Sequence, residues 1–93
     1  MERFLVRAAR FGLVVRVADN RFFPPAALRQ LGEMAEALAA ADAGERFTAA
    51  GLRDAAGIGR NLAIDVVEYF DRAGFTRRIG NERRILKPAA EVF

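Results

Sequence analysis

The sequence predicts a mostly helical α+β domain, and three features of its 93 residues carry this prediction. Apolar residues recur every three or four positions in residues 25–41 and 60–73, as they do on the buried face of an amphipathic helix. Residues 13–23 and 75–87 are rich in β-branched, aromatic or arginine residues around a short turn, and each segment predicts a β-hairpin. Two helices that meet at a tight glycine turn, residues 57–59, and precede a hairpin have the element order of a winged helix.

The N-terminal part of the chain predicts a helix and a hairpin. A short helix over residues 2–11 is expected to stop at Gly12, because glycine readily adopts the left-handed conformation that follows a last helical turn. Residues 13–17 and 21–23 are the expected strands of the first hairpin. The two prolines that follow end its second strand.

Three helices are expected after this hairpin. The first starts at Pro25, because proline suits the first turn of a helix. Thr48 follows a short strand, and its hydroxyl can accept a hydrogen bond from a free backbone N–H at the start of a helix over residues 49–56. Gly57 ends that helix, and residues 60–73 form the third.

A second hairpin closes the predicted domain and repeats the first. Its strands are expected over residues 75–79 and 83–87. A shift of the chain by 62 positions (72 minus 10) superposes Arg10, Gly12, Arg16 and Arg21 on Arg72, Gly74, Arg78 and Arg83. We therefore expect residues 1–24 to be the last helix and wing of a preceding winged helix, and residues 25–93 to be a complete one. The alternative is a chance match within an arginine-rich chain.

The composition excludes most catalytic chemistry. The chain has no Cys, His, Ser or Trp, so it offers no thiol or serine nucleophile, no imidazole base and no Cys/His metal site. We expect no enzyme activity, cofactor, metal or small-molecule substrate in this segment. It has neither a secretory signal nor an apolar run of the roughly 18 residues that a membrane-spanning helix needs. The expectation is a cytoplasmic protein that does not enter a membrane.

The charge of the chain points to an anionic partner. Fifteen basic residues against 12 acidic ones give a formal charge of +3 and a pI near 10.5, and all the basic residues but Lys87 are arginine. Arginine suits bidentate contacts with phosphate, although codon bias in a GC-rich genome would also enrich it. Between residues 72 and 87 the basic residues are Arg72, Arg77, Arg78, Arg83, Arg84 and Lys87, against the single acid Glu82.

Residues 47–86 carry a resemblance to a known family. Their most specific part is the run Glu-Tyr-Phe-Asp-Arg at residues 68–72, followed by Gly74 and by Thr-Arg-Arg at residues 76–78. This segment resembles the last winged helix of the bacterial selenocysteine-specific translation elongation factor. The resemblance implies an RNA-binding domain that grips the messenger-RNA hairpin marking an in-frame UGA for recoding. It also implies a GTPase parent, through which the ribosome and selenocysteinyl-tRNA would be partners.

Two positions depart from the family pattern. Gly59 and Asn61 stand where a small hydroxyl residue and a basic residue are expected, so a phosphate contact at the start of the third helix should be weaker or differently made. The phosphate-binding motif G-x-x-x-x-G-K-[ST] does not occur, so the GTPase itself is not encoded in this segment.

The acidic residues of the third helix disfavour its lying along a nucleic-acid groove in the ordinary way. Asp65, Glu68 and Asp71 are spaced by three residues, share one face and would repel phosphates. Contact is therefore expected from the tip of this helix and from the wing. The candidate RNA-binding residues are Arg60, Asn61, Arg77, Arg78, Asn81, Arg83 and Arg84.

The repeat separates the wing arginines into two pairs. Arg78 and Arg83 have arginine counterparts in the first hairpin, whereas Arg77 and Arg84 match apolar residues. We expect Arg77 and Arg84 to serve RNA and the other pair to serve the shared fold. The alternative is that both wings bind RNA and that the shared pair is the functional one.

Two other classes of function stay open at this point. A DNA-binding winged-helix regulator would have the same element order, but its third helix should carry basic or amide side chains where Asp65 and Glu68 stand. A protein-interaction winged helix would need an exposed apolar stripe, for which Val14 and Phe22 are the available hints.

Overall fold

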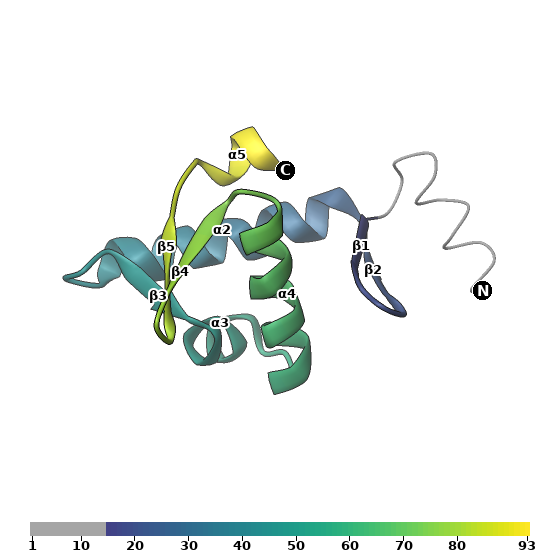
Figure 1. Ribbon diagram of the computed structural model, residues 1–93, viewed down its shortest axis with the longest axis horizontal. Coiled ribbons are helices and arrows are strands. Elements are labelled where there is room, and N and C mark those ends of the chain that lie inside the picture. Colours follow the sequence, from purple (N-terminus) through teal and green to yellow (C-terminus); the bar gives the residue numbers. More distant parts are fainter. Residues whose placement is uncertain (1–14) are drawn as a thin grey trace.

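The computed structural model describes residues 15–93, and its elements follow the winged-helix order (Figure 1). The helix expected over residues 2–11 and its stop at Gly12 lie outside the described residues. The elements are β1 (Val15–Ala18), β2 (Arg21–Phe23), α2 (Pro25–Ala41), β3 (Arg46–Thr48), α3 (Ala49–Ala56), α4 (Arg60–Arg72), β4 (Thr76–Ile79), β5 (Glu82–Ile85) and α5 (Ala89–Val92). The mixed, mostly helical winged-helix fold expected from the sequence is confirmed.

Local chemistry sets the ends of α3. The Thr48 hydroxyl accepts a hydrogen bond from the Gly51 N–H at 3.0 Å, so the cap expected from the sequence is present. Gly57 ends the helix with φ of +67°, a left-handed conformation that a residue with a side chain rarely adopts. The chain then turns at once into α4, which begins at Arg60.

The wing is the antiparallel pair β4–β5, and β5 is the central strand of a three-stranded sheet in the order β3-β5-β4. Ile79 lies opposite Glu82, so two residues, Gly80 and Asn81, make the turn. Both strands are shorter than expected. Across the sheet, Arg83 lies opposite Arg78 on one side and Phe47 on the other.

The core lies between α2, α3, α4 and the inner face of this sheet. Its fully buried members include Leu28 from α2, Leu52 from α3 and Phe70 from α4. Phe93, beyond α5, adds to the core, with its ring centroid 5.3 Å from that of Phe70 and 5.1 Å from that of Phe75. The sequence reasoning took Pro88 as a terminator and did not anticipate α5.

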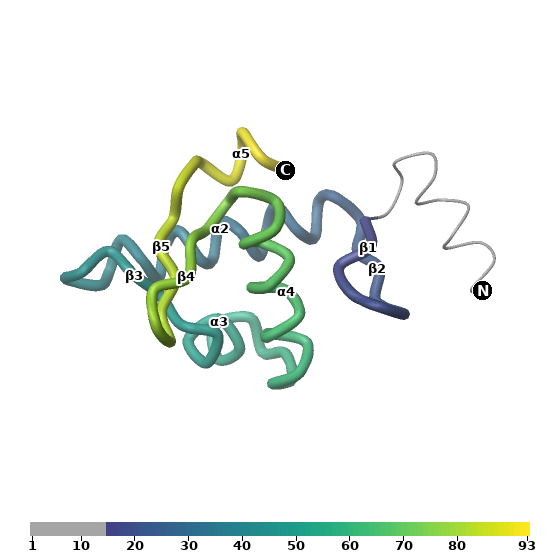
Figure 2. Tube along the Cα trace, viewed as in Figure 1, coloured from purple at the N-terminus to yellow at the C-terminus, as the bar shows by residue number. Residues whose placement is uncertain are grey.

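The β1–β2 hairpin packs on the side of α4 opposite the wing (Figures 1 and 2). Val17 is fully buried in the common core, and its carbonyl oxygen accepts a hydrogen bond from Arg72 Nη2 at 2.6 Å. Arg21 forms an ion pair with Asp65 at 2.6 Å. The acidic face of α4 therefore meets the β1–β2 hairpin at Asp65.

The two hairpins resemble each other less closely than the sequence repeat suggests. In the wing, Arg78 lies opposite Arg83, so the repeat would place Arg16 opposite Arg21. Arg16 instead lies opposite Phe22, because the turn of the first hairpin begins after Ala18, one residue later than the aligned wing turn, which begins after Ile79. The pairwise equivalence of the two hairpins is therefore wrong, and the division of the chain at residue 24 stays a prediction.

Candidate nucleic-acid interface

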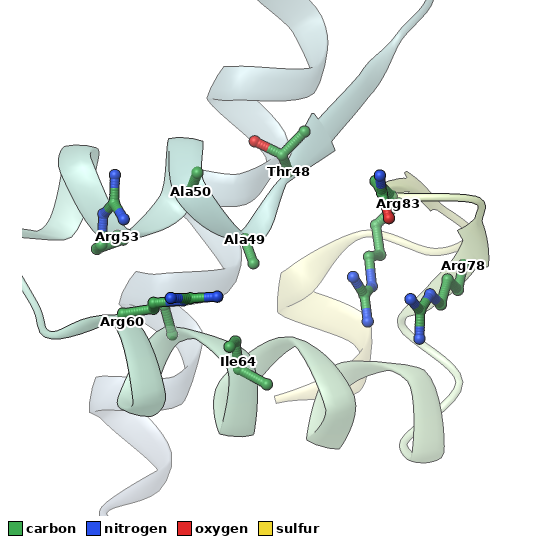
Figure 3. A pocket seen from close by; sticks show the side chains of 10 residues that line it. Thr48, Ala49, Ala50, Arg53, Arg60, Ile64, Arg78 and Arg83 are labelled. Carbon is green, nitrogen blue, oxygen red and sulfur yellow. The ribbon is translucent and has the colours of Figure 1, made fainter.

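A hollow of about 380 Å³ lies between α3, the start of α4 and the wing, and we call it the helix-tip hollow (Figure 3). Helices α3 and α4 and the wing supply its walls, and its lining combines arginines with small or apolar side chains. The lining residues are Thr48, Ala49, Ala50, Arg53, Arg60, Ala63, Ile64, Arg78, Asn81 and Arg83. Four of the seven residues predicted from the sequence, Arg60, Arg78, Asn81 and Arg83, meet here.

The start of α4 supplies the first cation of the hollow. Arg60 is exposed and is the first residue of the helix, and Figure 3 shows its side chain along the edge of the hollow. Gly59 precedes it and has no side chain that could cap the free N–H groups of the first turn. These N–H groups and the positive end of the helix dipole favour an anion near Arg60. Asn61 is exposed nearby but does not line the hollow.

The wing supplies the second exposed cation. Arg78 lies near the end of β4, and its Nε donates to the carbonyl oxygen of Gly80 at 2.8 Å. This bond holds the guanidinium at the turn, while the side chain reaches towards α4 (Figure 3). Asn81, one of the two turn residues, is exposed beside it.

Arg83 occupies a different environment from the one expected. Its side chain is only 7% exposed, and its Nη2 forms an ion pair with Asp71 Oδ2 at 3.3 Å. A surface phosphate contact needs an exposed guanidinium. Arg83 is instead a buried part of the wall of the helix-tip hollow, which corrects the expectation that it lies exposed on the wing.

Arg77 and Arg84 lie on the other face of the sheet. They are opposite each other across β4 and β5, one position out of phase with Arg78 and Arg83, and side chains alternate between the two faces of a strand. Both are exposed, but neither lines the helix-tip hollow. Arg84 lines a separate depression with two acids, Glu36 and Glu45.

Arg53 is a lining residue that was not among the candidates named from the sequence. Its Nε contacts Asp54 Oδ1 at 3.0 Å, so Arg53 forms an ion pair with its neighbour in the chain. Asp54 is largely exposed, and Arg53 lines the hollow on the same side as Arg60 (Figure 3). Arg53 lies on α3, the helix that precedes α4 in the helix-turn-helix, and this position was the signal that could have identified it.

Comparison with known proteins places the chain in a family. A family model described as "Elongation factor SelB, winged helix" matches residues 38–85. The selenocysteine-specific elongation factors of Escherichia coli and Haemophilus influenzae are 38% and 30% identical to the chain over 82 residues, which is 88% of the chain. The chain spans 13% of the length of each of these relatives.

A solved structure supports the same placement. The mRNA-binding domain of SelB from E. coli, determined in complex with SECIS RNA, superposes with a TM-score of 0.81 and 36% sequence identity. The match covers 89% of this chain and 67% of that one. The fold therefore defines a winged-helix domain. The chain belongs to the elongation factor SelB winged-helix family, as its resemblance predicted.

Proposed function

We propose that this domain binds a structured messenger-RNA hairpin through the helix-tip hollow. The observation that carries the proposal is the convergence of Arg53, Arg60 and Arg78 from three separate elements around one hollow. The E. coli relative is an mRNA-binding domain whose structure contains SECIS RNA, so the same class of partner fits the family.

The lining of the hollow suits an unpaired nucleotide next to a phosphate backbone. Guanidinium groups at the rim can bind phosphate oxygens in pairs, and the small side chains of Ala49, Ala50 and Ala63 with Ile64 offer an apolar floor for a base. Double-stranded RNA hides its base edges in a deep, narrow major groove, so proteins read RNA sequence mainly at loops and bulges. A hairpin with an unpaired nucleotide therefore matches the hollow better than a plain duplex.

In the full-length protein this binding would serve recoding. We infer that the chain is a segment of a cytoplasmic translational GTPase whose catalytic part lies outside it. The hairpin would recruit that factor to an in-frame UGA, and the ribosome and selenocysteinyl-tRNA would be partners only through the parent protein.

The main alternative is DNA binding by α4 in a major groove. The flank of α4 that carries Asp65 is covered by the β1–β2 hairpin, and Asp71 is engaged by Arg83 of the wing. Glu68, between them, is exposed and anionic. A helix covered on both sides that presents a carboxylate is poorly suited to enter a groove lined by phosphates.

A binding titration with three matched nucleic acids tests the proposal. The first is an RNA hairpin with loop and bulge selected from a randomised pool, the second is its stem as plain duplex RNA, and the third is duplex DNA of the stem sequence. The hairpin should bind at least about ten-fold more tightly than either duplex, because both duplexes lack an exposed base. Three arginine contacts predict a log-log salt slope of about −2 to −3. Equal affinity for the DNA duplex would overturn the proposal.

A further inference from the structure

Asp71, which no RNA group is expected to touch, joins both strands of the wing to the end of α4. Its Oδ1 accepts a hydrogen bond from the Thr76 hydroxyl on β4 at 2.6 Å. Its Oδ2 accepts from Arg83 Nη2 on β5 at 3.3 Å. Thr76 and Arg83 are 2% and 6% exposed, so one carboxylate fixes the wing from beneath.

The Arg83 guanidinium depends on this carboxylate. Its Nε is buried and has no acceptor among residues 15–93, and Arg78 lies directly opposite it on the neighbouring strand. Directly opposed like charges destabilise a strand pair unless a counter-charge lies close. Asp71 supplies that counter-charge and so allows the two arginines to lie side by side.

Helix α4 therefore fixes the positions of both exposed arginines at its two ends, Arg60 directly and Arg78 through the wing. Arg60 lies at its first turn, and Asp71 holds the wing that carries Arg78 at its last turn. We propose that Asp71 is a positioning residue for RNA binding, which sets the wing arginine relative to the helix tip without contacting RNA. This inference rests on the proposed function of the hollow.

The sign of the effect of a neutral substitution distinguishes positioning from simple electrostatics. Asp71 is an anion beside a surface that binds a polyanion, so electrostatics alone predicts that Asp71→Asn tightens RNA binding. Positioning predicts the opposite, because an asparagine cannot offer Arg83 and Thr76 two charged acceptors and the wing loses its fixed orientation. A residue that serves stability alone would lower the melting temperature and leave the affinity of the folded protein unchanged.

The experiment compares Asp71→Asn with Glu68→Gln, using the hairpin selected on the unmodified protein. Glu68 is a matched control, because it is an acid on the same helix, is exposed and forms no ion pair with another described residue. Affinity is measured over a range of salt concentrations at a temperature well below the melting temperature of each variant.

We expect Asp71→Asn to weaken binding about five-fold or more, since loss of preorganisation lowers affinity without removing a contact. Its salt slope should equal that of the unmodified protein, because no phosphate contact is lost. Glu68→Gln should bind as tightly as the unmodified protein or more tightly. Unchanged or tighter binding by folded Asp71→Asn would overturn the proposal, as would an equal loss in Glu68→Gln.

A second variant covers the case in which Asp71→Asn does not fold. Thr76→Val removes only the hydrogen bond to Oδ1 and keeps the ion pair with Arg83. It should weaken binding about two-fold or more, in keeping with the loss of one buried hydrogen bond. Unchanged affinity would then overturn the proposal. Failure of the unmodified protein to bind any hairpin would instead contradict the proposed function itself.

Discussion

The two faces of the wing sheet should contribute differently to RNA binding, and Arg78→Ala compared with Arg84→Ala measures the difference. Arg78 lines the helix-tip hollow, whereas Arg84 lines a depression that also contains Glu36 and Glu45. A charge-assisted hydrogen bond contributes about 1.5 to 3 kcal/mol, and the exposure of Arg78 places it at the lower end of this range. A loss of about 1.4 kcal/mol corresponds to ten-fold in Kd, so we expect about ten-fold for Arg78→Ala. For Arg84→Ala we expect less than about two-fold, because its acidic neighbours offset its attraction for phosphate.

Fluorescence anisotropy with the labelled hairpin measures both dissociation constants, and thermal melting controls for folding. Arg78→Ala should also reduce the steepness of the log-log salt slope by about 0.7 to 0.9, the value for one phosphate contact. Its melting temperature should change little, because Arg78 is exposed and within residues 15–93 its guanidinium bonds only to the carbonyl of its own turn. An equal or larger loss of binding in Arg84→Ala would refute the assignment of the hollow as the RNA site and favour the sorting expected from the repeat.

Three further substitutions test the site and the packing. Arg60→Ala should weaken hairpin binding about five-fold or more with a nearly unchanged melting temperature, since an exposed cation contributes little to folding; a large drop in melting temperature with intact binding would show that Arg60 is structural. Arg21→Ala breaks the ion pair with Asp65 on the far side of α4, so it should cost at most about 1 kcal/mol of unfolding free energy and leave RNA affinity unchanged; a marked loss of affinity would place RNA on that side as well. Gly32→Leu should lower the unfolding free energy by about 1 to 3 kcal/mol in denaturant titration, because a Cβ there would lie 3.1 Å from that of Ala89; full stability would show that α5 does not pack as described.

The helix boundaries could be predicted because they depend on local chemistry. Pro25 starts α2, Thr48 caps α3 and Gly57 ends it, and each of these signals acts within a few residues of its own position. The aromatic packing of Phe93 could not be predicted from the sequence. Phe93 follows α5, and a four-residue helix has no recognisable period and gains its stability from tertiary contacts.

The candidate site was predictable only in part, because tertiary packing decides which side chains of the wing face the helices. Sequence reasoning identified the wing arginines but could not tell which face of the sheet is covered, since this depends on the packing of Phe47 and Thr76 against the helices. Strand alternation separates Arg77 and Arg84 from Arg78 and Arg83, and it does not say which pair faces the helix tip. The ion pair of Arg83 with Asp71 joins residues 12 positions apart and follows from the fold alone.

Nuclear magnetic resonance during a titration with the selected hairpin tests the location of the RNA most directly. Signals of the backbone amides and of the arginine Nε–H groups report each guanidinium separately. We predict that the largest shift changes occur at Arg53, Arg60 and Arg78 and that Arg84 and the β1–β2 hairpin change little. Largest changes at Arg84 or in the β1–β2 hairpin, with the helix-tip hollow unaffected, would contradict the account.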